Sequence, residues 1–117
     1  MNTVDIAEAF SGHRFGETYD RLADDVRWVL VGQGVLEGRD AVVAACEASA
    51  AEMAQLASTE FSRFVSVGDE RLAAVDAIGH YVGADGTTSV VSSADLYEFD
   101  GEGRVTTITS YAVELEG

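Results

Sequence analysis

Asp95 is the residue whose type and surroundings point most directly to chemistry. It lies within residues 90–105, VVSSADLYEFDGEGRV. Alternate side chains of a strand point to opposite faces, so Asp95 shares a face with Ser93, Tyr97 and Phe99. Loss of hydration in apolar surroundings disfavours the charged form of a carboxyl group, which then serves as a general acid or base. The alternative is a structural aspartate, paired with a hydroxyl group, an arginine or a backbone N–H.

Two aromatic residues accompany this carboxyl group as candidate ligand contacts. Trp28 alternates with Leu30 on one face of the strand predicted at residues 25–31. An indole ring can stack on a flat ligand and its N–H offers one donor, although a tryptophan can equally anchor a core. Tyr19, on a short helix predicted at residues 17–23, could bring its hydroxyl group to a cavity mouth or simply pack against the core.

The histidines and the single cysteine suggest neither a catalytic dyad nor a metal site. His80 and Asp76 share a strand face but lie four residues apart, roughly 13 Å, too far for direct contact. His13 falls in the sequence SGHRFG and is predicted to be a solvated loop residue, and Cys46 is predicted to be a small buried apolar residue. No metal-ligand spacing is present, so we expect no metal and no cofactor.

Length and charge restrict the class of protein. The 117 residues, 47% hydrophobic, suffice for a single domain spanning residues 1–117 with its own core. A formal charge of −14 disfavours nucleic acid and anionic membranes as partners and favours a neutral or cationic ligand. The sequence has no apolar run of transmembrane length and its N-terminus lacks the pattern of a secretory signal, so a cytoplasmic location is expected.

The order of the predicted elements indicates an α+β domain. Short helices at residues 2–10 and 17–23 precede the first strand, a glycine turn with a short strand piece, and a long helix at residues 39–57. Four strands then follow, joined by turns rich in Gly and Asp, as in an antiparallel meander. We expect a curved antiparallel sheet wrapped around the long helix and the two short N-terminal helices, forming a cone with an internal cavity.

The last predicted strand, residues 104–115, suggests a homodimer. Its side chains facing away from the cavity are semi-apolar, namely Val105, Thr107, Thr109, Tyr111, Val113 and Leu115. A small domain that exposes such a sheet face commonly buries it against a second copy.

The chain resembles the SnoaL-like branch of the nuclear transport factor 2-like superfamily, which also contains the ketosteroid isomerases. The resemblance rests on residues 21–42, RLADDVRWVLVGQGVLEGRDAV, and on residues 93–111, SADLYEFDGEGRVTTITSY. It implies that Asp95 occupies the place of the isomerases' pocket carboxylic acid. The isomerase base would fall at Leu30 and the oxyanion tyrosine at about Asp5 or Ile6, so steroid isomerisation by that mechanism is not expected.

The resemblance also implies a cavity and a range of functions. SnoaL-like cyclases depend on an acidic pocket residue for aldol ring closure, and we expect Asp95 as the catalytic residue here. The expected substrate-binding residues are Trp28, Leu30, Tyr97, Ser93, Ile108, Ser110, Ala112 and Tyr19. The leading hypothesis is binding of a hydrophobic, oxygenated small molecule, with cofactor-free isomerisation, cyclisation or dehydration. The alternatives are a non-catalytic binding or dimerisation module and, third, an epoxide hydrolase, which needs two acids and an arginine around a water.

Overall fold

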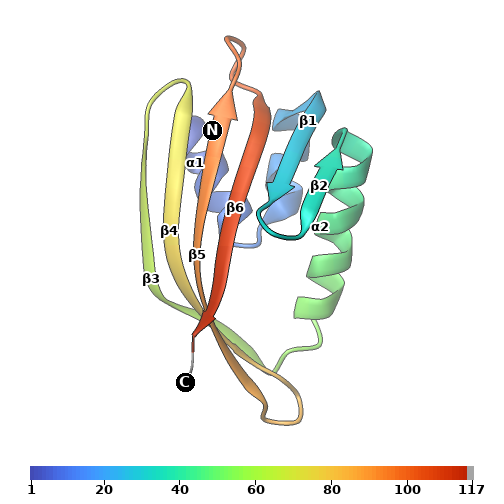
Figure 1. Cartoon of the computed structure of the whole chain (residues 1–117), viewed down its shortest axis with the longest axis vertical. Coiled ribbons are helices and arrows are strands. Elements are labelled where there is room, and N and C mark those ends of the chain that lie inside the picture. The colour runs from blue at the N-terminus through green and yellow to red at the C-terminus, as the bar shows by residue number, and fades with distance from the viewer. Residues whose placement is uncertain (116–117) are drawn as a thin grey trace.

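The computed structural model describes residues 1–115, and Figure 1 shows their arrangement. The elements follow the predicted order of two short helices, a strand, a short strand, a long helix and four strands. They are α1 (Thr3–Ser11), η1 (Phe15–Arg21, a 3-10 helix), β1 (Leu22–Leu30), β2 (Gly34–Glu37), α2 (Arg39–Met53), β3 (Ser58–Gly68), β4 (Leu72–Val82), β5 (Thr88–Phe99) and β6 (Val105–Leu115).

The strands form one curved sheet in the order β2-β1-β6-β5-β4-β3. The meander from β3 to β6 is antiparallel, as predicted. The prediction of a purely antiparallel sheet is wrong at one position, because β1 pairs with β6 in the parallel sense. Alternation of side chains within a strand does not reveal the direction of a neighbour that is distant in the chain, so the sequence pattern could not show this pairing.

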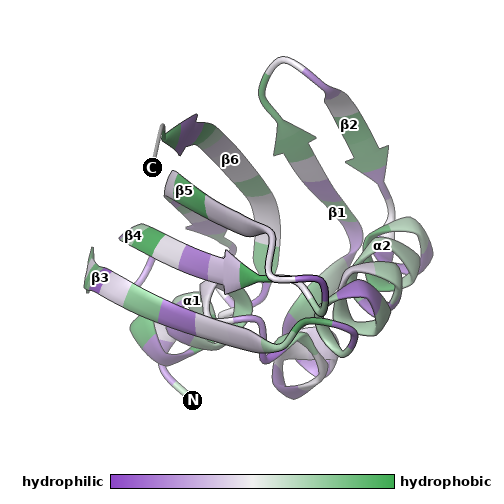
Figure 2. Cartoon of the chain, turned by 90° about the horizontal axis from the view of Figure 1, so that it is seen from below, coloured by the Kyte–Doolittle hydropathy of each residue, from purple (hydrophilic) through white to green (hydrophobic). Residues whose placement is uncertain are grey.

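The two α-helices cover different parts of the concave face. Figure 2 shows α1 beneath β3 and β4, while α2 lies beside β1 and β2. Only Val42 and Cys46 of α2 are buried. The helix ends at Met53, four residues before the predicted end, because the backbone N–H of Ala57 already donates to the carbonyl of Val82. The long helix therefore lies along one side of the sheet, against β1, β2 and η1.

The core holds α1 firmly against the sheet. Asn2 caps this helix through a reciprocal pair of hydrogen bonds with Asp5, and Ile6 and Phe10 point into the core, as their spacing predicted.

Cys46 is completely buried, and burial raises the pKa of its thiol to about 12. The prediction of Cys46 as an apolar packing residue is confirmed.

The convex face of the sheet differs from the prediction at Val105. Thr106 is an extra residue in β6, because Phe99 pairs with Val105 while Glu98 pairs with Thr107. This bulge turns Val105 inward, where it is 1% exposed. The rest of the predicted outward set does lie away from the cavity.

Within residues 1–115, no helix is long and apolar enough to span a membrane.

Candidate functional site

A cavity of about 290 Å³ lies between the end of α1, the flank of α2 and the concave face of the sheet. Most of the exposed surface of its wall is apolar, and its polar groups come from both α-helices, the turn after α1 and the sheet. A mostly apolar wall with some placed polar groups is usual for a small-molecule site. The lining residues are Phe10, Ser11, His13, Phe15, Trp28, Leu30, Ser49, Phe61, Tyr81, Val91, Ser93, Asp95, Ser110 and Ala112.

Asp95 lies in this cavity at the end of a chain of hydrogen bonds. Ser11 Oγ donates to Asp95 Oδ2 at 2.7 Å and lies 2.6 Å from Tyr97 Oη. Ser11 comes from the last turn of α1, whereas the other two residues alternate on the inner face of β5. Tyr97 is completely buried, so its hydroxyl group has no access to water.

The direction of these hydrogen bonds follows from the number of protons. The one proton of Ser11 goes to Asp95, so Tyr97 must donate to Ser11. A proton on Asp95 Oδ2 would supply a third O–H donor for only two hydrogen bonds, so the O–H of Ser11 or of Tyr97 would have no acceptor in this chain, which costs about 1–3 kcal/mol. The chain therefore holds Asp95 Oδ2 as an acceptor, while Oδ1 has no side-chain hydrogen bond among the described residues.

His13 is a cavity residue, and its prediction as a solvated loop residue is wrong. Its Nε2 atom lies 3.0 Å from Tyr81 Oη, and its ring stacks on Phe61 with 5.7 Å between centroids. The backbone turns after α1 with His13 in the left-handed region, at φ 67°, a conformation that most residues avoid. The contacts of the ring with Tyr81 and Phe61 offset this local strain.

Burial fixes the protonation of the His13–Tyr81 pair at neutral pH. Desolvation lowers the pKa of His13, although the negative charge of Asp95 opposes the shift. Desolvation, followed by the charge of Asp95, raises the pKa of Tyr81. A neutral imidazole and a protonated phenol therefore line the cavity in the field of the Asp95 carboxylate.

The cavity includes most of the residues that the sequence pointed to. Asp95, Trp28, Leu30, Ser93, Ser110 and Ala112 all line it. Trp28 contributes its ring and not a free donor, because Nε1 donates to Ser110 Oγ at 2.9 Å.

Three of the predicted substrate-binding residues lie outside the lining. Tyr97 and Ile108 are each 0% exposed in the core. They point inward as predicted, but other side chains cover them. Tyr19 is half-buried against the core, next to Glu47 of α2. A molecule in the cavity would therefore not touch Tyr97 itself, which is linked to the cavity only by its hydrogen bond to Ser11.

Sequence reasoning missed Ser11, His13, Phe61 and Tyr81. Tyr81 could have been found, because it follows Ala77 and Gly79 on the inward face of the same strand. Ser11 and His13 lie at a helix end and in a turn, where no periodicity indicates the direction of a side chain.

His80 and Asp76 share a strand face, as predicted, and that face is the convex one. His80 Nε2 is 2.8 Å from Ser62 Oγ, and Asp76 forms an ion pair with Arg63 at 2.9 Å.

Throughout residues 1–115, no group of three or more His, Cys, Asp or Glu side chains is arranged to hold a metal ion.

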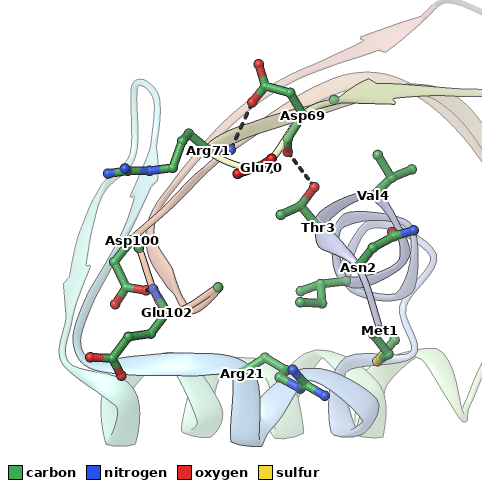
Figure 3. Close-up of a pocket in the computed structure, with 14 residues that line it drawn as sticks. Met1, Asn2, Thr3, Val4, Arg21, Asp69, Glu70, Arg71, Asp100 and Glu102 are labelled. Carbon is green, nitrogen blue, oxygen red and sulfur yellow. Dashed lines mark hydrogen bonds between the residues drawn. The ribbon is translucent and has the colours of Figure 1, made fainter.

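A larger hollow of about 590 Å³ opens where α1 begins, between the β3–β4 and β5–β6 turns (Figure 3). Its acidic side chains stabilise these turns. Asp69 accepts hydrogen bonds from the backbone N–H groups of Arg71 and Leu72, and Asp100 accepts them from those of Glu102 and Arg104. These bonds lower the pKa of both carboxyl groups. The smaller, mostly apolar cavity around Asp95 is therefore the better candidate site.

The curved sheet with its two flanking α-helices is the fold of NTF2-like proteins, as a similar solved structure of that class shows. More particularly, the chain belongs to the SnoaL-like domain family, whose model matches residues 4–108. An NTF2-like protein of unknown function from Cytophaga hutchinsonii is similar, with 27% identity, TM-score 0.79 and 93% and 94% of the two chains covered.

Two structures named for an enzymatic activity share the fold. One is a candidate polyketide cyclase from Xanthomonas campestris, with 20% identity, TM-score 0.68 and 91% of this chain and 83% of that chain covered. The other is an LEH-like epoxide hydrolase from M. tuberculosis, with 16% identity, TM-score 0.66 and coverage of 95% and 82%. No curated protein matches the sequence.

Proposed function

We propose that the cavity binds a small hydrophobic molecule carrying a carbonyl oxygen and that Asp95 catalyses cofactor-free proton transfer on it. The observation that carries the proposal is the hydrogen bond from Ser11 to Asp95 Oδ2 inside a mostly apolar cavity. It orients the carboxylate as an acceptor and keeps Oδ1 free to act as a general base. The volume of about 290 Å³ suits a ligand of one or two rings.

The proposed step begins with Asp95 as a carboxylate. Its Oδ1 atom takes a proton from the carbon next to the substrate carbonyl, and the electron pair of the broken C–H bond moves into an enolate. Return of the proton to a different carbon completes an isomerisation. Attack of the enolate carbon on a second carbonyl of the substrate forms a C–C bond and completes a cyclisation, with the proton going to the new alkoxide.

The composition of the cavity wall distinguishes this chemistry from epoxide hydrolysis. Of the described residues that line the cavity, Asp95 is the only acid and none is an arginine. The two acids and the arginine required for epoxide hydrolysis are therefore not assembled here. Aldol-type cyclisation, for which one carboxylate suffices to form the enolate, is the closer fit.

2-Acetylnaphthalene, a two-ring ketone with exchangeable methyl protons, tests this proposal. We expect the protein to accelerate exchange of these protons for deuterium in D2O, followed by proton NMR. Ala112→Trp places a large ring in the cavity wall and should abolish both binding and exchange. Ala48→Trp, the same substitution at an exposed position of α2, should change neither.

Binding without any exchange would instead identify a non-catalytic ligand-binding module of the same fold. In that case Asp95 would hold the ligand or the sheet and transfer no proton.

The cytoplasmic location expected from the sequence remains a prediction.

We also propose that the protein forms a homodimer through its convex face. Val113 and Tyr111 are 62% and 52% exposed there, and Leu96 on the neighbouring strand is 39% exposed. Across the β5–β6 ladder these two strands present Ser92, Ala94, Leu96, Thr109, Tyr111 and Val113 together. Glu98 follows Leu96 on the same face, and Asp76 of β4, which is paired with Arg63, lies beside Ala94. The uncharged, semi-apolar row on β5 and β6 is the centre of the proposed interface, with these carboxylates around it.

The dimer predicts a mass of about twice 12.4 kDa by light scattering at micromolar concentration. Val113→Glu should weaken dimerisation by about 100-fold or more, because two-fold symmetry places the new charge in the interface twice. Val31→Glu, at an exposed valine after β1, is the matched control. A wild-type monomer under these conditions would refute the dimer.

A further inference from the structure

Tyr81 and His13 form a second polar pair in the cavity that the proposed base does not use. Both residues line the same cavity as Asp95, but they come from β4 and from the turn after α1. The negative charge of Asp95 affects the pKa of both side chains, so both lie within range of its field.

The histidine tautomer follows from what surrounds its ring. Nδ1 of His13 is buried and has no hydrogen-bond partner among the described residues. A proton on Nδ1 would be a buried donor without an acceptor, which costs more than an acceptor that lacks a donor. The proton therefore belongs on Nε2, which donates to Tyr81 Oη at 3.0 Å.

This tautomer determines what Tyr81 can do. Its oxygen accepts from His13, so its own O–H proton is free to point into the cavity. Burial raises the pKa of the phenol, so the group keeps this proton at neutral pH and acts as a hydrogen-bond donor.

Gly79 gives the Tyr81 ring its position. A Cβ atom at residue 79 would lie 2.6 Å from Tyr81 Oη and 2.8 Å from two ring carbons. The phenol therefore lies back over the glycine backbone on the inner face of β4, where only a residue without a side chain leaves room for it.

We propose that Tyr81 donates a hydrogen bond to the carbonyl oxygen of the substrate, and that His13 is the positioning residue that orients this donor. The inference rests on the proposed function and adds the group that interacts with the substrate carbonyl oxygen. When Asp95 removes the carbon-bound proton, negative charge develops on the carbonyl oxygen. A preorganised O–H donor at that oxygen stabilises the enolate more than it stabilises the ketone.

The infrared carbonyl stretch of bound 2-acetylnaphthalene reports this hydrogen bond directly. We expect a lower frequency in wild type than in Tyr81→Phe, together with exchange about 100-fold slower in the variant. His13→Asn keeps a residue tolerant of the left-handed backbone and should give an intermediate frequency. Gly79→Ala keeps the hydroxyl group but displaces it, so its frequency should move toward that of Tyr81→Phe. Tyr111→Phe removes an exposed phenol on the convex face and is the control.

Each outcome separates this inference from the function on which it rests. Exchange by wild type, with the same carbonyl frequency and rate in Tyr81→Phe, would overturn the role of Tyr81 and leave Asp95 as the base. Absence of both binding and exchange in wild type would overturn the proposed function and this inference with it.

Discussion

Asp95→Asn should slow deuterium exchange of 2-acetylnaphthalene by about 10²–10⁴-fold while the protein stays folded. An amide oxygen can still accept the hydrogen bond from Ser11, so the chain of hydroxyl groups to Tyr97 remains intact. The amide cannot accept the carbon-bound proton, so only the chemistry is lost. NMR exchange rates and thermal unfolding at neutral pH measure the two effects on one sample.

The matched control is Asp76→Asn, which removes a carboxylate on the convex face. It should leave exchange unchanged. If Asp95→Asn instead exchanged the probe at the wild-type rate, Asp95 would not be the base. If it were severely destabilised at pH 7, the aspartate would be a structural partner of Ser11.

Ser11→Ala should destabilise the protein by about 1–3 kcal/mol, because it leaves the buried hydroxyl group of Tyr97 without a partner. Tyr97→Phe removes that hydroxyl group. The double variant should therefore lose less stability than the sum of the two single variants, with a coupling of about 0.5–3 kcal/mol. Urea unfolding of the four proteins measures this coupling.

Ser93→Ala provides the control for this cycle. Ser93 lines the same cavity on the same strand face, and its replacement should change stability by no more than about 0.5 kcal/mol. Strict additivity of Ser11→Ala and Tyr97→Phe would contradict the chain of hydrogen bonds and the fixed orientation of Asp95 derived from it.

The part of the site on β5 was predictable from the sequence because a strand has a period of two. Asp95 and Ser93 face the cavity as the alternation requires, and so do Trp28 and Leu30 on β1. The turns rich in Gly and Asp marked the meander for a similar local reason, because few other residues adopt these turn conformations.

The other half of the site depends on how distant segments meet. Ser11 approaches Asp95 only because α1 packs across the sheet, and His13 turns inward only because the backbone after α1 takes a left-handed conformation. The bulge at Thr106, which buries Val105, and the parallel pairing of β1 with β6 are likewise set by tertiary contacts. Neither the bulge nor the parallel pairing can be recognised from the local spacing of apolar residues.

A crystal structure of the protein with 2-acetylnaphthalene bound tests most directly whether the cavity is a catalytic site built around Asp95. We predict the ketone in the cavity between α1 and the sheet, with its methyl carbon against Asp95 Oδ1. A ketone bound only in the hollow beside the β3–β4 and β5–β6 turns, or in the cavity with its methyl group away from Asp95, would contradict this assignment.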